Sequence, residues 1–125
     1  MIGYVTLGTN DFERAAAFYD NLLSLFEAKR ALETEKMILW SNGKSGRAML
    51  GVIKPYDKNK ATVGNGTMVS LAVDAPTKVD ELHKKALALG GTDEGAPGSR
   101  GGGFYGAYFR DLDGNKLCVF CMVKG

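Results

Sequence analysis

Hydrophobic and polar residues alternate in two short segments that resemble each other. One runs from Gly3 to Gly8, and the other runs from Thr67 to Ala72, 64 residues further along the chain. Alternation with a period of two is typical of β-strands, because successive side chains point to opposite faces of a sheet. Each segment therefore predicts a strand, and their similarity indicates two copies of one module.

Each of these strands is followed by apolar residues at spacings of three and four, which is typical of an amphipathic helix. In the first copy the apolar positions are Phe12, Ala15, Ala16, Tyr19, Leu22, Leu23 and Phe26, and in the second they are Val79, Leu82, Ala86 and Leu89. Asn10 and Glu13 have the spacing of a capping box at the start of the first helix. Pro76 suits the first turn of the second helix, and Gly90-Gly91 predicts its end.

Further β-branched and apolar stretches predict three more strands in each copy. They cover Glu27–Leu32, Lys36–Trp40 and Arg47–Ile53 in the first copy, and Thr92–Glu94, Phe104–Phe109 and Lys116–Val123 in the second. The last two are joined by Asp111-Leu112-Asp113-Gly114-Asn115, a strong turn signal in which Gly114 is expected at positive φ. The pattern predicts an α+β fold in one domain of residues 1–125, with βαβββ modules at about 1–57 and 66–125.

Composition narrows the class of protein. The 125 residues carry a net charge of +2, which does not favour binding to nucleic acid or to an anionic membrane. It also gives little reason to expect a strongly cationic ligand. We expect no nucleic-acid partner, no membrane partner and a cytoplasmic location, since the chain starts in a strand-like pattern rather than a signal peptide. A single histidine excludes any mechanism that needs two.

The two cysteines, Cys118 and Cys121, have the C-x-x-C spacing of redox and zinc sites. They lie in an apolar, β-branched run that predicts a strand, where residues three apart point to opposite faces. We therefore expect two buried free thiols that do not meet.

Several motifs together resemble a known family. They are the opening Tyr4-Val5-Thr6-Leu7, the following Asp11-Phe12-Glu13-Arg14 with Phe18-Tyr19, and the closing Tyr108-Phe109-Arg110-Asp111-Leu112-Asp113-Gly114-Asn115. With two βαβββ modules, they resemble the vicinal oxygen chelate superfamily of glyoxalases, bleomycin resistance proteins and extradiol dioxygenases. The resemblance implies cupped mixed sheets around a cavity, with the helices outside. It also implies a homodimer, because members of this size usually pair their modules across two chains.

Metal-dependent members of this family hold their ion with histidine and glutamate on the first and last strands of each module. The corresponding positions here are Tyr4, Met68, Cys118 and a position within Arg47–Ile53, a stretch that contains no His, Asp or Glu. Phenol, thioether and thiol groups do not form a site for a hard metal ion. We expect no metal and no other cofactor, with a soft metal at Cys118 and Met68 as the alternative. His83 is no substitute, since we expect it on the second helix, outside the cavity, as a surface or helix-flank residue.

The cavity implied by the resemblance should still exist. Strand alternation and the family positions predict seven ligand-binding residues and no catalytic residue: Tyr4, Thr6, Met68, Ser70, Arg100, Tyr108 and Cys118. Thr6 and Tyr108 resemble substrate-contacting residues of the fosfomycin-resistance thiol transferases. For each hydroxyl, a bond to neighbouring backbone is an equally good explanation. Arg100 lies in the glycine-rich Ser99–Gly103, which predicts a mobile connection or, as an alternative, a lid whose arginine meets an anion.

Two functions from different classes follow from these residues. The first is a metal-free protein of the glyoxalase and bleomycin-resistance type that binds a small, partly apolar organic molecule in its cavity. The second is a lyase or isomerase of the glyoxalase type that uses Tyr4 or Tyr108 as acid or base, or an unrecognised metal site. An ordinary tyrosine pKa near 10 fits neutral-pH catalysis poorly, which favours the first. An interaction protein with an empty cavity is a third possibility.

Overall fold

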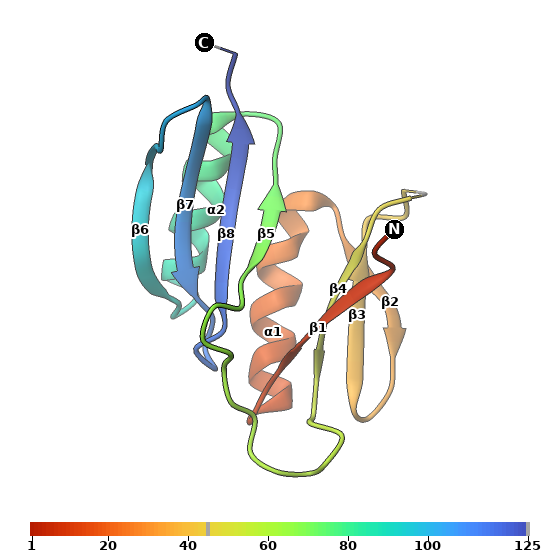
Figure 1. The fold of residues 1–125 in the computed structure, drawn as a ribbon. Helices are drawn as coiled ribbons and strands as arrows, with labels where there is room; N and C mark the ends of the chain where they lie inside the picture. The colour runs from red at the N-terminus through yellow and green to blue at the C-terminus, as the bar shows by residue number, and fades with distance from the viewer. Residues whose placement is uncertain (45, 125) are drawn as a thin grey trace. The chain divides into compact units, whose positions relative to one another are not determined.

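The computed structural model describes residues 1–44 and 46–124. The chain forms two compact units, Met1–Thr62 and Val63–Gly125. Each unit contains a four-stranded mixed sheet and an α-helix (Figure 1), in the α+β class that the sequence predicts. The predicted modules, about 1–57 and 66–125, fall inside these units, and Ser45 and Gly125 lie outside the described residues.

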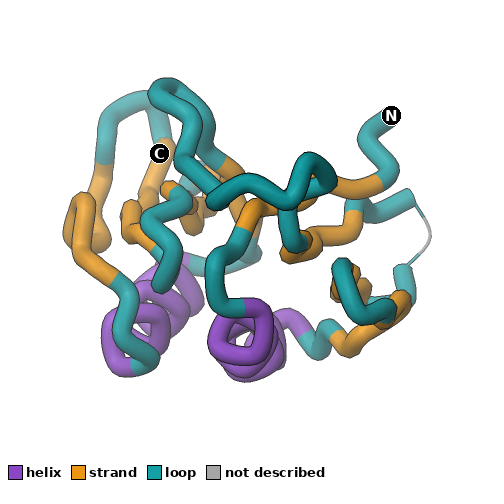
Figure 2. The backbone as a smooth tube through the Cα atoms, turned by 90° about the horizontal axis from the view of Figure 1, so that it is seen from below, coloured by secondary structure: helices purple, strands orange, loops and turns teal. Residues whose placement is uncertain are grey.

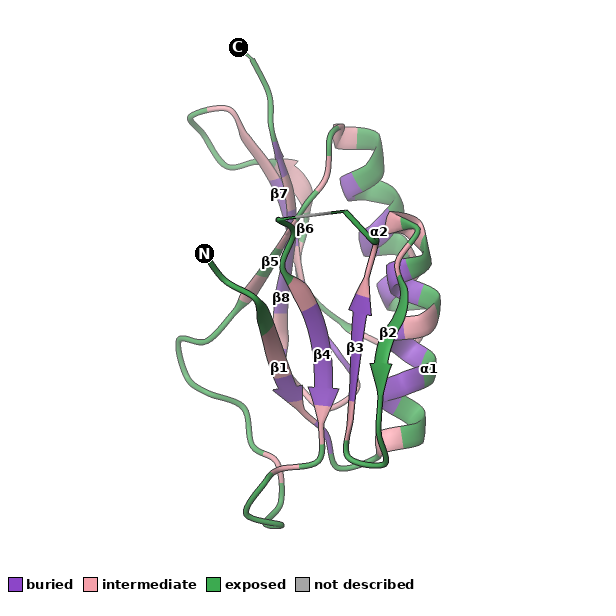
Figure 3. Ribbon diagram, turned by 90° about the vertical axis from the view of Figure 1, so that its right-hand side faces the viewer, coloured by how far each residue is buried: buried purple, intermediate pink, exposed green. Residues whose placement is uncertain are grey.

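The first unit has the order of elements expected of a βαβββ module. Its elements are β1 (Tyr4–Gly8), α1 (Phe12–Leu22), the 3₁₀ turn η1 (Leu23–Phe26), β2 (Lys29–Glu33), β3 (Met37–Ser41) and β4 (Met49–Ile53). The strands lie in the order β1-β4-β3-β2, with β1 parallel to β4 and the other pairs antiparallel. Edge strand β2 is exposed along its whole length, whereas β3 is mostly buried (Figure 3).

The start of α1 differs from the predicted capping box. The N-cap is Asp11, whose carboxylate accepts a hydrogen bond from the Arg14 backbone N–H at 3.1 Å. Asn10 instead bonds to the backbone of Ala61. Asp11 is the N-cap because its extended backbone lets its short side chain reach the N–H group of the third helical residue. The predicted apolar stripe is confirmed as far as Leu22, and its remainder continues as η1.

One face of the first sheet packs against α1. The Trp40 indole N–H donates to the Asp20 carboxylate at 2.9 Å, and the Trp40 ring lies 5.7 Å from the Tyr19 ring. The helix of each unit lies to one side of that unit's strands (Figure 2). Trp40 therefore faces α1, and its neighbour Leu39 points to the opposite face because side chains alternate along a strand. We call this opposite face, which also carries Leu39's register partner Gly51, the helix-free face.

The second unit repeats this arrangement. Its elements are β5 (Val69–Ala72), α2 (Pro76–Ala88), β6 (Thr92–Ser99), β7 (Phe104–Arg110) and β8 (Lys116–Met122). The strands lie in the order β5-β8-β7-β6, and the β5–β8 pair is parallel, as β1–β4 is in the first unit. Within the described residues, neither helix has the length and hydropathy needed to cross a membrane.

Both ends of α2 follow the sequence signals. Pro76 occupies the first turn, where its missing N–H costs nothing. Gly90 adopts a φ of 102° just past the C-cap. The Gly90 N–H donates to the Leu87 carbonyl and the Gly91 N–H to the Ala86 carbonyl, which is the Schellman pattern.

Strand β6 is longer than predicted. The sequence predicts Thr92–Glu94, but the strand continues to Ser99 through Gly95, Ala96, Pro97 and Gly98, with two irregularities in its pairing to β7. The connection at Ser99–Gly103 forms a hairpin turn, in which the Arg100 N–H donates to the Phe104 carbonyl at 2.7 Å and the Phe104 N–H donates to the Gly101 carbonyl at 3.1 Å. Its mobility stays a prediction. Three successive glycines at positive φ make this turn possible.

Candidate ligand-binding site

The helix-free face of the second sheet brings four predicted site residues together. On the other face, the Tyr105 hydroxyl donates to Asp80 of α2 at 2.7 Å. Alternation along β7 therefore places Tyr108 on the helix-free face. Cys118 is the register partner of Tyr108 in β7 and of Ser70 in β5. Ser70, Cys118 and Tyr108 thus form a row across three adjacent strands.

Cys118 occupies the middle of this row and is fully buried. Burial raises the pKa of its thiol, and hydrogen bonds from Ser70 and Tyr108 act in the opposite direction to a smaller extent. Both cysteines are free and buried, as the sequence predicts. The three-residue offset directs Cys121 to the α2 side of the sheet.

Two cations lie near the ring of Tyr108. The Arg100 guanidinium carbon is 5.5 Å from the ring centroid, and the Lys116 ammonium is also 5.5 Å from it. Contacts at this distance are attractive because the ring face carries negative charge. The two cations also make the electrostatic potential beside Ser70, Cys118 and Tyr108 more positive, which favours an anionic group on a ligand.

Arg100 follows β6 directly and is held by the end of that strand. Its guanidinium donates to the carbonyl of Ala96 at 2.6 Å and to that of Gly98 at 2.9 Å. Gly95 lies against both Tyr108 and Arg100, and a side chain there would crowd the Tyr108 ring. These two hydrogen bonds hold the Arg100 guanidinium beside the Tyr108 ring.

An aromatic pair extends the same face. The rings of Phe104 and Phe120 are stacked with centroids 5.0 Å apart and an angle of 6° between their planes. Nearby, Arg110 pairs with Glu94 at 2.7 Å, so its charge is compensated within the sheet. The face combines hydroxyls, a thiol, two cations and an apolar aromatic surface.

The other three predicted site residues are Tyr4 and Thr6 of the first unit and Met68, at the edge of the second sheet. Tyr4 and Thr6 alternate with Val5 and Leu7 on β1, and the register with β4 places them on the helix-free face of the first sheet. Met68 immediately precedes β5 and is exposed. Whether these residues contact a ligand remains a prediction.

The metal-ligand positions of the family can be compared through strand register. Thr6 pairs with Gly51 as Ser70 pairs with Cys118, so Gly51 is the first unit's equivalent of Cys118. Glycine offers no donor side chain, and the thioether of Met68 and the phenol of Tyr4 are poor ligands for hard cations. Within residues 1–44 and 46–124, no three His, Cys, Asp or Glu side chains cluster to hold an ion. The residues present do not fit the metal of the metal-dependent members.

The expectation for His83 is wrong. It is buried, with 6% of its surface exposed, and its Nε2 lies 3.0 Å from the Asp93 carboxylate. The His83 side chain lies on the face of α2 that packs on the sheet, next to Leu82 and Ala86. The hydrogen bond to Asp93 at the start of β6 compensates its burial.

Lys116 and Phe104 are the residues of the face that the sequence reasoning missed. Each is related to a predicted inward position, Cys118 or Tyr108, by an even number of residues along the same strand. Period-two alternation alone would have placed both on this face.

Comparison with known proteins places these observations in context. The sequence profile of the Glyoxalase/Bleomycin resistance protein/Dioxygenase superfamily matches residues 1–119. A crystal structure of a glyoxalase/bleomycin resistance protein from Albidiferax ferrireducens T118 is 34% identical, with a TM-score of 0.87 over 97% of this chain and 98% of that one. A search of curated proteins found no match.

Two further structures are more distant. A hypothetical protein, SA1046 of S. aureus, is 28% identical, with a TM-score of 0.74 over 97% of this chain and 92% of that one. A glyoxalase/bleomycin resistance protein/dioxygenase family enzyme from Burkholderia phytofirmans PsJN is 20% identical, with a TM-score of 0.76 over 97% and 98% of the two chains. The last similarity concerns the fold alone.

Proposed function

We propose, from the premise that this chain belongs to the glyoxalase, bleomycin resistance protein and dioxygenase superfamily, that it binds a small organic anion without a metal ion. The binding surface in this proposal is the helix-free face of the second sheet. The observation that carries it is the row of Ser70, Cys118 and Tyr108 flanked by the cations of Arg100 and Lys116.

The chemistry of this face defines the class of ligand. A carboxylate or similar anion would lie near Arg100 and Lys116 and accept a hydrogen bond from the Tyr108 hydroxyl. A planar or apolar part of the molecule would pack on the stacked rings of Phe104 and Phe120. A few polar groups set in an apolar surface are typical of small-molecule sites. Tyr4 and Thr6 of the first unit are proposed as additional contacts.

Binding rather than catalysis is favoured by the donor groups. The thiol of Cys118 is kept protonated by burial, and the remaining side chains of the row are hydroxyls. None of them is a strong acid or base at neutral pH. The proposal therefore predicts that the hemithioacetal isomerisation of glyoxalases is absent and that added Zn²⁺ or Ni²⁺ does not restore it.

A thermal-shift screen of small aromatic and aliphatic carboxylic acids tests the proposal, because a ligand specific to the folded state raises the melting temperature. Native mass spectrometry of the purified protein tests for a retained molecule. Tyr108→Phe should weaken binding of a hit by about 0.5–1.5 kcal/mol, and Tyr4→Phe should do so if Tyr4 contributes.

Tyr105→Phe is the matched control. It removes a hydroxyl from the same strand but from the opposite face, where Tyr105 bonds to Asp80. Equal losses in the two β7 variants would contradict the proposed face. Metal-dependent isomerase activity that disappears in Cys118→Ala or Met68→Ala would favour the lyase or isomerase alternative.

A further inference from the structure

A pocket in the first unit has no part in the proposed ligand site. It has a volume of about 410 Å³ and lies where β1 and β4 end. Its lining residues are Thr9, Asn10, Lys36, Ile53, Lys54, Pro55, Tyr56, Lys58, Asn59 and Lys60. Four of these described residues are lysines and none is acidic, so the lining carries a formal charge that only an anion would neutralise.

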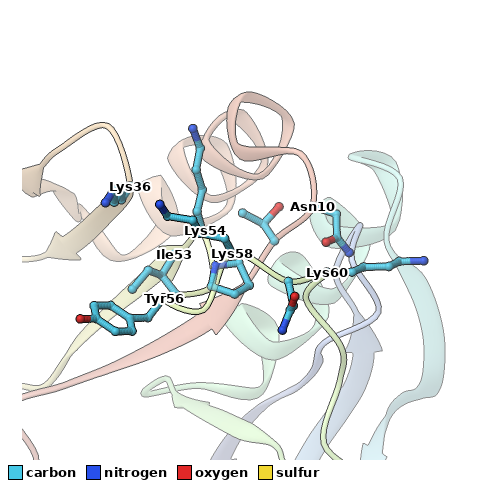
Figure 4. Close-up of a pocket in the computed structure, with 10 residues that line it drawn as sticks. Asn10, Lys36, Ile53, Lys54, Tyr56, Lys58 and Lys60 are labelled. Carbon is cyan, nitrogen blue, oxygen red and sulfur yellow. The ribbon is translucent and has the colours of Figure 1, made fainter.

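The lysines come from two segments that are distant in sequence. Lys36 precedes β3, whereas Lys54, Lys58 and Lys60 belong to the segment after β4 (Figure 4). Within residues 1–44 and 46–124, no carboxylate forms an ion pair with any of the four. Lys54 lies 5.3 Å from the Phe12 ring, a contact that leaves its charge uncompensated.

Hydrogen bonds hold the segment after β4 against the rest of the unit. At its start, the Lys54 N–H donates to the Lys36 carbonyl at 2.8 Å. At its end, the Asn10 side chain makes two bonds to the Ala61 backbone, at 2.7 and 3.0 Å. The exposed Asp57 carboxylate accepts bonds from the backbone and side-chain N–H groups of Asn59 on the same loop. Lys54, Lys58 and Lys60 are therefore presented by a hydrogen-bonded loop, which lowers the entropic cost of binding.

Lys58 adopts an unusual backbone conformation. Its φ is 65°, in the left-handed region that favours glycine, and its N–H closes a turn onto the Pro55 carbonyl at 3.0 Å. Strained non-glycine residues of this kind gather at binding sites. A glycine would fit this turn with less strain, yet the position carries a cation that lines the pocket.

We propose that this pocket binds a small molecule that carries a diphosphate or triphosphate group. Four lysines among the residues that line one cavity suit a multiply charged anion, and lysine is a point-charge ligand for phosphate. Tyr56, which is 98% exposed, stands beside Ile53 at the pocket and offers a flat surface to the organic part of the molecule. The cations here serve a different ligand from that proposed for the second sheet.

Titration with inorganic pyrophosphate, followed by the amide resonances of residues 54–60, tests the proposal. At moderate ionic strength the Kd should lie below about 1 mM, and binding should weaken as salt is added. Lys36→Gln and Lys58→Gly should each raise the Kd about threefold or more, and the double variant about tenfold. Lys58→Gly also relieves the strained φ, so weaker binding in this variant would not reflect loss of folding.

Lys84→Gln, on the exposed face of α2, is the control with the same change of net charge. It should bind pyrophosphate as the unmodified chain does, and so should Tyr108→Phe. Absence of saturable shifts up to about 10 mM would overturn the proposal, and so would equal weakening in Lys84→Gln and Lys58→Gly.

The organic part of the ligand is tested with adenosine diphosphate as a second probe. It should bind about threefold more tightly than pyrophosphate, and Tyr56→Ala should remove that difference while leaving pyrophosphate binding intact. Equal affinities for the two probes in the unmodified chain would overturn the role of Tyr56.

Discussion

The thiol of Cys118 lies beside polar neighbours and is fully buried. Burial raises its pKa, against the opposing effects of Ser70, Tyr108 and the nearby cations. In a Cys121→Ser variant, we expect iodoacetamide to alkylate folded Cys118 at least about tenfold more slowly at pH 7.5 than the same chain in urea, because the thiolate is the nucleophile. Equal rates in the folded and unfolded chains would contradict this prediction.

Gly114 closes the turn between β7 and β8 with a φ of 89°. Asp111 braces the turn, since its carboxylate accepts bonds from the backbone of Asp113 and Asn115. We expect Gly114→Val to lower the free energy of unfolding by about 1–3 kcal/mol, because a β-branched residue is strained at positive φ. Urea denaturation measures the change.

Gly3→Ala is the control for this substitution, since Gly3 has no neighbouring atom within 4 Å of an added Cβ. It should change stability by less than about 0.5 kcal/mol. An unchanged midpoint in Gly114→Val would show that the turn tolerates a branched side chain.

Gly114 and His83 differ in how well their structural roles can be predicted from the sequence. The positive φ of Gly114 is confirmed because turn chemistry depends on a few adjacent residues. The burial of His83 could not be predicted in the same way. It depends on Asp93, whose carboxylate lies 3.0 Å from the His83 ring after the α2–β6 connection. That hydrogen bond allows a polar ring to be buried at a position that the sequence suggests is exposed.

At the scale of elements, Asp20 joins α1 to two strands. Its carboxylate accepts bonds from Trp40 of β3 and from Arg30 of β2, which in turn pairs with Glu33. We expect Asp20→Ala to cost about 1–3 kcal/mol of unfolding free energy, because the Trp40 indole N–H, in a residue 2% exposed, loses its acceptor. Glu33→Ala removes only an exposed partner of Arg30 and should cost less than about 1 kcal/mol.

The same contacts make the stability that Asp20 contributes dependent on pH. Hydrogen bonds from Arg30, and then from Trp40, lower the pKa of Asp20 below its ordinary value of 3.8, although burial acts against them. A depressed pKa stabilises the fold above the unfolded value and loses that contribution as pH falls through the folded value. Acid denaturation should therefore be less steep in Asp20→Ala, and an identical profile would contradict this assignment.

Sequence periodicity predicts elements well where one face is buried. The apolar stripe of α2 and the alternation of β7 and β8 agree with the structure to within a residue or two. Strand β6 is the exception, because Gly95, Pro97 and Gly98 are poor strand formers. Its extension to Ser99 depends on pairing with β7, a tertiary interaction that local propensity does not contain.

The whole chain is expected to form a homodimer. Exposed apolar side chains of Tyr4, Met68 and Met122 lie on or beside the helix-free faces, and such residues are commonly covered by association. Light scattering at about 50 µM should give twice the 13.4 kDa mass of the chain. A mass of one chain that persists at higher concentration would contradict the prediction.

The close packing at Gly51 limits how the helix-free face of the first sheet could be redesigned. A Cβ at this position would lie 2.6 Å from the Ile38 carbonyl oxygen and would collide with the Leu39 side chain, so β3 already occupies the space that any side chain would need. A carboxylate introduced here, at the equivalent of Cys118, would have to displace the neighbouring strand as it appeared. A single substitution at Gly51 therefore cannot place a metal ligand on this face of the sheet. Leu39 would have to be smaller and β3 would have to shift as well, so a designed metal site here needs coordinated changes in two strands.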